Sequence, residues 1–233
     1  MIIKDRMCGR YTLMVQEQDL IAEFDLIGDG NCDYAVRYNI APTQNVPVVR
    51  VVEGQRRLNP LRWGLVPFWA KDLKIGSRMI NARSEEAASK PAFRSALRKH
   101  RCLVPCTGFF EWKVVGESTA RKPAKQPYYI HRRDNRVFGL AGIWERWNAP
   151  DGALVESYSI LTTSPNDLVA TLHDRMPVIV RRDAYALWLD AEMQDTTRLQ
   201  PIFAPFPATD FVANRVSTRV NTPLHDAPDC IEE

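Results

Sequence analysis

Five short segments rich in β-branched and aromatic residues follow one another between residues 101 and 163. They read RCLVP, GFFEWKV, PYYIHR, VFGLAGIWERW and SYSILTT, and turn residues or charged loops separate them. Segments of this length and composition are typical of β-strands. Further strands are predicted at 46–52, at 58–65 with Pro60 marking an edge or bulge, at 176–182 and at 211–217. This pattern constrains the fold most strongly, because it predicts a mostly antiparallel sheet.

Helices are predicted between these strands. Residues 16–27 place apolar side chains at helical spacing, and the GDGN run at 28–31 ends that helix. Residues 84–100 form helix with Ser84 as N-cap, and Pro91 either breaks it or starts a second helix. Ser164 is expected to cap a helix that begins at Pro165, and residues 183–189 form another.

With no repeat or linker evident, the chain is predicted to be one α+β domain. Its mostly antiparallel sheet is expected to curve into an open, barrel-like core flanked by short helices. The proline-rich stretch from residue 201 should wrap the surface.

The overall composition limits the function classes. The 233 residues are 45% hydrophobic, enough for a continuous core, and no apolar run approaches the roughly 18 residues of a membrane span. No secretory signal is recognisable at the start, so a cytoplasmic protein with no membrane partner is expected. The net charge of +3 is compatible with an anionic partner without requiring one.

The five cysteines do not indicate a disulfide framework or a metal site. Cys102 and Cys106 have no second pair of ligands to complete a zinc site, and no CxxC motif is present. We expect these two residues to be buried thiols, and we expect no metal.

Glu111 lies in the strand GFFEWK. A two-residue period puts Phe110 and Trp112 on one face, and Phe109, Glu111 and Lys113 on the other. Glu111 is therefore expected to be half-buried beside aromatic rings, which raises a carboxyl pKa toward a value useful for proton transfer. A strand-face glutamate paired with Lys113 or a neighbouring arginine would also explain the pattern.

Other polar residues could also carry chemistry. His173 stands where a helix stops and a strand begins, and it could act as an acid or base near neutral pH. Alternatively, it is a histidine whose charge offsets the dipole of a helix C-terminus. Asn81 could cap a turn and Arg83 could be solvated, so neither residue specifies a function alone.

Arginines and aromatic residues recur together along the chain. The pairs are Arg10-Tyr11, Arg37-Tyr38, Arg62-Trp63 and Phe68-Trp69, and Arg175 follows His173. Single-stranded nucleic acid binds to such mixtures, through guanidinium groups on phosphates and rings under bases. Core aromatics flanked by surface charge give the same pattern.

The segment RMCGRYT at 6–12 contains a possible second start. If synthesis began at Met7 and that methionine were removed, Cys8 would carry a free thiol and a free α-amine on adjacent carbons. Such an aminothiol is an unusual nucleophile.

Taken together, these segments resemble the SOS-response-associated peptidase (SRAP) family of abasic-site-processing proteins. The matching motifs follow the family's order: MCGRYT at 7–12, RYNIAPTQ at 37–44, RWGLVPFWA at 62–70, INARSE at 80–85, CLVPCTGFFEWK at 102–113, LAGIWE at 140–145, LTTSPN at 161–166 and LHDRMPVIV at 172–180. Each is short, but eight in register are hard to obtain by chance. The resemblance implies a SRAP domain over residues 7–220 and a C-terminal tail at 221–233.

The resemblance also implies a function. Members of the family bind single-stranded DNA at an abasic site and link themselves to it covalently. An α-amine with a pKa near 8 is partly neutral at physiological pH and can form a Schiff base with the sugar aldehyde. The neighbouring thiol can then close a thiazolidine ring, so no cofactor is expected.

The resemblance assigns roles to individual residues. Cys8, Asn81, Glu111 and His173 are expected to be catalytic. Asn81 would orient the amine or sugar, Glu111 would shuttle protons, and His173 would assist ring opening. Arg10, Arg83 and Arg175 are expected to hold phosphates, Trp69 to stack on DNA, and Asn39 and Pro42 to shape the DNA-binding pocket. In this family two adjacent tryptophans occur near Trp69, whereas this chain has Ala70 after it.

Residues 1–6 depart from the family, because a retained extension would leave Cys8 with an amide nitrogen. We interpret them as a misassigned start; self-cleavage before Cys8 is the alternative. Two other functions stay open: a cysteine peptidase with Cys8 as nucleophile and His173 as base, and a plain single-strand binding module. We expect a monomer, with the replication machinery as a candidate protein partner.

Overall fold

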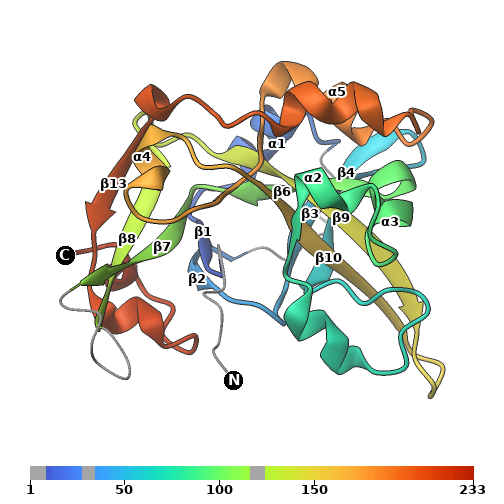
Figure 1. Ribbon diagram of the computed structural model, residues 1–233, viewed down its shortest axis with the longest axis horizontal. Coiled ribbons are helices and arrows are strands. Elements are labelled where there is room, and N and C mark those ends of the chain that lie inside the picture. Colours follow the sequence, from blue (N-terminus) through green and yellow to red (C-terminus); the bar gives the residue numbers. More distant parts are fainter. Residues whose placement is uncertain (1–8, 28–34, 116–123) are drawn as a thin grey trace.

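The computed structural model describes residues 9–27, 35–115 and 124–233, and all statements below concern these residues (Figure 1). The predicted α+β fold is confirmed: strands dominate and short helices lie at the periphery. No helix among these residues is both long and apolar enough to cross a bilayer.

Five strands form a closed ring at the centre of the molecule. They are β3 (Asn45–Val52), β4 (Gln55–Trp63), β6 (Arg101–Cys106), β9 (Phe138–Asn148) and β10 (Leu154–Thr163). The barrel-like core predicted from the sequence is confirmed, but it is closed and not open as expected, because β10 pairs with both β4 and β9. The β3–β4 hairpin is tight because Glu53 and Gly54 both adopt positive φ, which suits a two-residue turn.

Three short strands extend the ring. They are β5 (Asn81–Arg83), β11 (Met176–Pro177) and β12 (Ile179–Val180). The single strand predicted at 176–182 is therefore two strands with different partners, since β11 pairs with β10 and β12 pairs with β9. The pairings of β10 with β4 and β5 are parallel, while the other strand pairings among the described residues are antiparallel.

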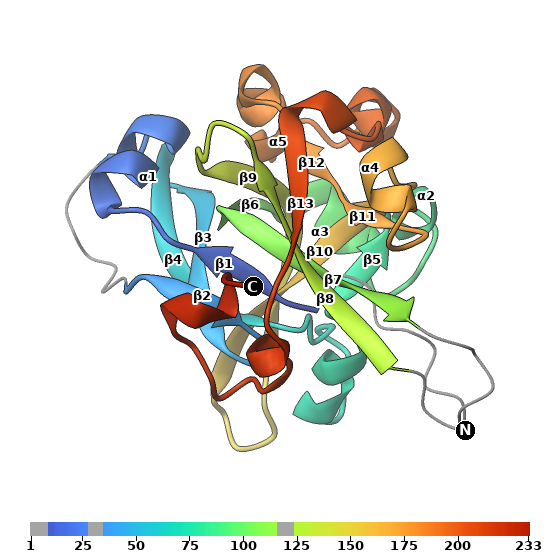
Figure 2. The ribbon, with the colours of Figure 1, turned by 90° about the vertical axis from the view of Figure 1, so that its left-hand side faces the viewer.

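A second sheet covers one side of the ring in the order β13-β8-β7-β1-β2. Its strands are β1 (Tyr11–Leu13), β2 (Arg37–Ile40), β7 (Gly108–Val115), β8 (Ala124–Arg132) and β13 (Phe211–Arg215). Figure 2 looks onto this sheet, with β13 and β8 in front. A hydrogen bond of 2.9 Å between the buried hydroxyls of Tyr11 and Tyr158 joins the second sheet to β10 of the ring.

The helices are shorter than predicted. They are α1 (Glu17–Phe24), α2 (Ser84–Ala87), α3 (Arg94–Lys99), α4 (Asp167–Ala170) and α5 (Tyr185–Leu189). Asp25 adopts the left-handed conformation and ends α1 before the GDGN run, which lies outside the described residues. Pro91 lies between α2 and α3, so residues 84–100 form two helices.

Both predicted caps are wrong. Ser84 is the first residue of α2, and Arg83 holds the cap position. Asn166, not Ser164, caps α4: its side-chain oxygen accepts from the Val169 amide at 2.9 Å, while its side-chain NH₂ donates to the Phe206 carbonyl. Asparagine caps a helix as well as serine does, and here it also binds a second segment.

Six 3-10 turns complete the chain. They are η1 (Leu73–Arg78), η2 (Arg182–Ala184), η3 (Thr196–Phe203), η4 (Ala208–Asp210), η5 (Thr218–Asn221) and η6 (Pro228–Cys230). The stretch from residue 201 was predicted to wrap the surface, but it also contributes buried side chains. These are Phe203, Val216, Val220 and Cys230.

Cys102 and Cys106 are buried free thiols, as predicted. Burial raises the pKa of both, which makes them inert as nucleophiles.

Candidate functional site

The C-terminal end of β10 brings together two segments that are ninety residues apart in the sequence. On one side Asn81 and Arg83 of β5 pair with Ile160 and Thr162. On the other side β11 pairs with Thr162 and Thr163. The motifs INARSE and LHDRMP therefore flank the same strand end, which is where sequence reasoning assigned four site residues.

An ion pair locks these two segments to each other. Both terminal nitrogens of Arg175 donate to the carboxylate of Glu85, at 2.6 and 2.7 Å, and one also donates to the Thr162 carbonyl at 2.7 Å. The Arg175 side chain is only 13% exposed. Burial is the largest single influence on Glu85 and opposes its ionisation. The hydrogen bonds from Arg175, from the Glu85 backbone and from Ser84, together with the charge of Arg175, outweigh burial and lower the pKa of that carboxyl.

His173 lies two residues before Arg175, in the turn that follows α4. Its side chain is mostly buried, and its Nδ1 lies 3.2 Å from the Arg175 amide and 2.9 Å from Asp174 Oδ1. The two contacts exclude each other, because an Nδ1 that accepts from the amide has no proton to donate to Asp174. Whether Nδ1 carries a proton thus decides which of the two contacts forms.

Arg83, unlike Arg175, has a side chain that is largely exposed to solvent. Its side chain is 55% exposed and makes a long ion pair with Glu86, at 3.4 Å. Such an exposed pair contributes little to stability, so Arg83 can exchange it for an external anion.

Glu111 is more deeply placed than the sequence suggested. The predicted alternation is confirmed: Phe109 packs into the main core, while Phe110 and Trp112 pack into a smaller cluster on the other side of β7. Glu111 was expected to be half-buried, but it is 1% exposed. The prediction fell short because the closed ring lies against the face of β7 that carries Phe109 and Glu111.

Cys8 lies outside the described residues. The first described residues after it, Gly9 and Arg10, run beside the strand that carries Glu111. The Arg10 carbonyl accepts a hydrogen bond of 3.0 Å from the amide of Phe110. Tyr11 pairs with Phe109 in the same antiparallel register. The segment that leads into β1 is therefore adjacent to the strand that carries Glu111.

Arg10 and Asn39 are occupied by the C-terminal residues. Arg10 donates to Asn39 Oδ1 at 3.0 Å and to the carbonyls of Val220 and Asn221 at 2.6 and 3.2 Å. The Asn39 side-chain NH₂ donates to the carbonyls of Val220, Thr222 and His225, at 3.2, 3.1 and 2.7 Å. Asn39 is completely buried, and burial lowers the pKa of Arg10.

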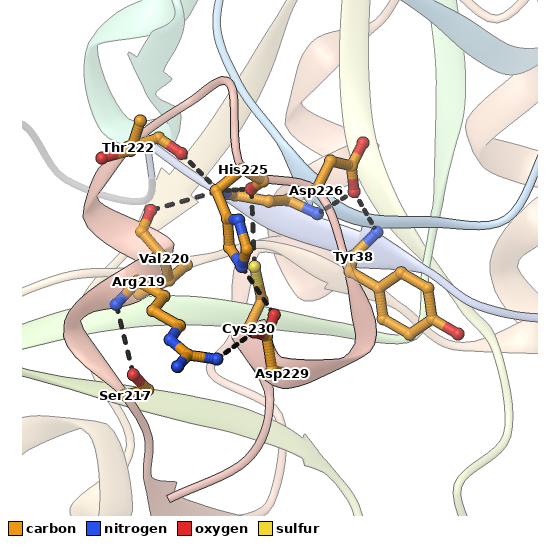
Figure 3. Close-up of polar contacts among 10 residues, drawn as sticks. Tyr38, Ser217, Arg219, Val220, Thr222, His225, Asp226, Asp229 and Cys230 are labelled. Carbon is orange, nitrogen blue, oxygen red and sulfur yellow. Dashed lines mark hydrogen bonds and ion pairs between the residues drawn. The ribbon is translucent and has the colours of Figure 1, made fainter.

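Asp226 completes this arrangement (Figure 3). One carboxylate oxygen accepts from the backbone amides of Tyr38 and Asn39, at 2.6 and 2.8 Å. The other carboxylate oxygen accepts from Arg37. We call Arg10, Arg37, Asn39, Asp226 and the backbone of 220–225 the C-terminal anchor. It fixes residues 217–233 against β1 and β2.

The side chains of His225, Asp229 and Cys230 lie next to this anchor, with possible metal-ligand atoms within 4.8 Å of one another. These residue types suit zinc. However, Asp229 already accepts from Arg219 and lies 2.6 Å from His225 Nε2, and a guanidinium beside the carboxylate opposes a cation (Figure 3). Cys230 Sγ is 3.5 Å from the His225 carbonyl, so the group is satisfied as a hydrogen-bonded network.

Trp69 lies on a separate surface, in the loop between β4 and η1. It is 48% exposed, and its neighbour Phe68 is 61% exposed. The loop is held by a hydrogen bond of 2.7 Å from Trp147 Nε1 to the Ala70 carbonyl.

Sequence reasoning assigned no role to Glu85 or Asp226. Glu85 lies within the motif INARSE, so its position beside Arg83 could have marked it as a residue of the site. Asp226 follows a stretch that the sequence marks only as tail, and its partners are almost 190 residues away.

Comparisons with known proteins agree with one another. The family model described as SOS response associated peptidase (SRAP) matches residues 7–223. The chain is similar to the abasic site processing protein YoqW of Bacillus subtilis (strain 168), with 40% identity over 97% of this chain and 99% of that protein. It is also 30% identical to the abasic site processing protein HMCES of Gallus gallus, over 85% of this chain and 66% of that protein. A crystal structure of a Bacteroides thetaiotaomicron protein superposes with a TM-score of 0.82 at 25% identity, covering 97% of this chain and 99% of that one.

Proposed function

The chain belongs to the SOS response associated peptidase (SRAP) family, and we propose that it processes abasic sites by binding single-stranded DNA and forming a covalent thiazolidine through Cys8. Its relatives YoqW and HMCES are named abasic site processing proteins. The mechanism requires Cys8 to carry a free α-amine, so residues 1–7 must be absent from the reacting form.

One observation carries the proposal: the strand that leads from Cys8 runs directly beside the strand of the buried Glu111, joined by the Phe110 amide and the Arg10 carbonyl. A carboxyl group in such a position is shielded from water. It can pass protons at a nearby reaction centre without competition from solvent.

The chemistry balances without a cofactor. The Cys8 amine adds to the C1′ aldehyde of the ring-opened sugar, and the resulting carbinolamine loses water to give an imine. The Cys8 sulfur then adds to the imine carbon, and the thiol proton ends on the nitrogen. Ring closure is fast because both nucleophiles belong to one residue.

The remaining polar residues would act around this centre. Glu111 would give a proton to the leaving hydroxyl and recover it from the amine. His173 would assist opening of the sugar ring, and Asn81 would orient the sugar or the amine.

The arginines would differ in how readily they bind DNA, because some of them already pair with groups of the protein. Arg83 is exposed and would bind a phosphate directly. Arg175 would bind one only in competition with Glu85. Arg10 and Asn39 are held in the C-terminal anchor, so they would act mainly by positioning β1 and β2.

The test uses protein that begins at Cys8, mixed with single-stranded DNA that carries one abasic site. We expect a product that survives SDS and heat, and that Cys8→Ala abolishes. The control Cys32→Ala should crosslink normally. A normal yield with Cys8→Ala would refute the role of the thiol.

N-terminal acetylation should also abolish the product, because it removes the nucleophilic amine. Borohydride reduction adds a second readout: Cys8→Ala should still be trapped as a reduced imine, whereas the acetylated protein should not. If trapping survives acetylation, an internal lysine is the nucleophile and the proposal fails.

A further inference from the structure

Three buried hydroxyl groups meet where β1 lies beside β7 and β8 (Figure 1). The hydroxyl of Thr12 lies 2.7 Å from that of Thr107 and 3.0 Å from that of Tyr129. It also donates to the Gly108 carbonyl, at 3.1 Å. Thr12 is completely buried, and Thr107 and Tyr129 are almost so. We call these three side chains the hydroxyl cluster, and none of the proposed crosslinking chemistry uses it.

The hydrogen bonds of the hydroxyl cluster have only one consistent direction. A threonine hydroxyl has a single hydrogen and two lone pairs, and a carbonyl can only accept. Because Thr12 gives its hydrogen to Gly108, it accepts from both Thr107 and Tyr129. Thr107 in turn accepts from the Met14 amide at 3.1 Å. Burial raises the pKa of Tyr129, so its hydroxyl keeps the proton that it donates. A buried network in which every member is satisfied favours a single geometry.

The backbone pairing of β1 is too short to fix this strand strongly. Tyr11 and Thr12 pair with Phe109 and Gly108 of β7, and the register with β2 shifts between Tyr11 and Leu13. A slip of one residue would move the strand by about 3.4 Å and exchange its two faces. Such a slip would take Thr12 out of the hydroxyl cluster, so the cluster opposes it.

The position of β1 also decides where the chain leads at its N-terminal end. The Arg10 carbonyl accepts from the Phe110 amide, and this register, continued by one residue, puts Gly9 level with Glu111. Cys8 is the next residue in the sequence. A displacement of about 1 Å between reacting groups can slow a reaction roughly hundredfold. A slip of β1 would therefore be large enough to stop the chemistry.

We propose that Thr12 is a positioning residue of the crosslinking reaction, whose hydroxyl fixes the register of β1 and so holds the reactive terminus beside Glu111. This inference rests on the proposed function. Core packing alone does not call for the hydroxyl, because valine has the same shape and suits a buried strand position. The strand opposite is also adapted to the cluster. A Cβ on Gly108 would lie 2.4 Å from the Tyr129 ring, so glycine at this position lets the ring reach Thr12.

The test compares proteins that begin at Cys8 and carry Thr12→Val or Thr12→Ser. The rate of crosslinking to an abasic single strand is measured over a range of DNA concentrations, which gives the saturating rate and the half-saturating concentration. In Thr12→Val the saturating rate should fall roughly ten- to hundredfold. The half-saturating concentration should not change, because Thr12 is buried and touches no DNA. Thr12→Ser keeps the hydroxyl and should restore most of the rate.

Free acetaldehyde separates the position of the aminothiol from its reactivity. This small aldehyde diffuses to Cys8 and forms a thiazolidine without a fixed direction of approach. Intact mass should therefore show equal rates of modification in the parent protein and in Thr12→Val. A raised half-saturating concentration for DNA at an unchanged saturating rate would make Thr12 a binding residue and refute the proposal.

Tyr185→Phe is the control for lost stability. It removes another buried hydroxyl, which accepts from the Gly139 amide and donates to Glu23. This variant should unfold at lower urea concentration than the parent but crosslink at the same rate. If Tyr185→Phe and Thr12→Val lose rate in proportion to their lost stability, the effect is one of folding and the proposal is wrong.

A second variant, Tyr129→Phe, tests the cluster if Thr12→Val does not fold. It removes one donor to Thr12 and keeps the ring, so it should lower the saturating rate less than Thr12→Val does. An unchanged saturating rate in Tyr129→Phe would then refute the proposal.

The outcomes distinguish this inference from the proposed function. A parent protein that reacts with acetaldehyde but never crosslinks abasic DNA refutes the proposed function, and the role of Thr12 falls with it. A parent protein that crosslinks, and whose saturating rate Thr12→Val matches, refutes the positioning role alone.

Discussion

The C-terminal anchor and the groove between the Trp69 loop and α3 both contain arginines beside aromatic residues, yet the arginines are used in opposite ways. This α3 groove is lined by Phe68, Trp69, Arg94, Arg98 and Lys99. In the anchor, Arg10 and Arg37 donate to groups within the protein, and the hydrogen-bonding capacity of Asn39 is used up. In the groove, three cations and two rings have no partner among the described residues. An arginine next to an aromatic residue is therefore available to an external ligand only where the tertiary structure leaves its donors without internal partners.

The strongest test of the anchor is Asn39→Leu. The change leaves three carbonyls and the Arg10 guanidinium without their buried partner, so the free energy of unfolding should fall by about 3 kcal/mol. Urea denaturation measures this. The control Asn45→Leu, at an exposed position of β3, should stay within about 0.5 kcal/mol of the parent. Equal stabilities of the two variants would show that the anchor is not structural.

A substitution in the groove should weaken DNA binding and leave the free energy of unfolding unchanged. Trp69→Ala removes an exposed ring, so the affinity for single-stranded DNA should fall by about 2 kcal/mol, or roughly thirtyfold. Fluorescence anisotropy with a labelled oligonucleotide measures this. Leu224→Ala removes an apolar side chain that is 94% exposed elsewhere, and it should bind normally. Loss of stability without loss of affinity in Trp69→Ala would assign the ring to packing.

Arg175 is intermediate between the arginines of the anchor and those of the groove, since a single carboxylate, that of Glu85, pairs with its guanidinium. Glu85→Gln removes that competing charge and frees the guanidinium for a phosphate. The affinity for DNA should therefore rise by about 1 kcal/mol, or roughly fivefold, and the salt slope should steepen by about 0.7. Glu17→Gln in α1 makes the same charge change away from this strand end. Weaker binding of Glu85→Gln would mean that the ion pair itself builds the site.

The smallest expected effect concerns pH. Hydrogen bonds from His225 and Arg219 lower the pKa of Asp229 in the folded protein. The unfolded chain then binds more protons than the folded one below the ordinary aspartate pKa of about 3.9, so this stabilisation is complete above that pH and lost below it. The urea midpoint should fall less between pH 5 and pH 3 in Asp229→Asn than in the parent. Asp151→Asn, in the β9–β10 loop, should follow the parent; identical curves for all three would exclude a role for Asp229.

Much of the fold was predictable because strand and helix signals are local. The period of two in GFFEWK correctly assigned Phe110 and Trp112 to one face and Glu111 to the other. The depth of Glu111 was not predictable, because it depends on a ring of strands that closes only when β10 meets β4 and β9.

The candidate site shows the same limit. The sequence placed Asn81, Arg83, His173 and Arg175 in motifs, and the pairing of β5 and β11 with one strand end brings those motifs together. The ion pair of Arg175 with Glu85 has no local signature, because its partners are 90 residues apart. The same holds for Asp226, whose partners in β2 are reached only through the final fold.

The sequence by itself determined which chemical groups are present. These are a cysteine that N-terminal processing could leave with a free α-amine, a carboxyl group among aromatic rings, and cations spread along the chain. It also determined the strand-rich fold, because alternation and turn residues act over a few positions. Only the tertiary structure decided which cations are neutralised and which stay available. Ion pairing and burial depend on distances between remote segments, and local sequence does not encode those distances.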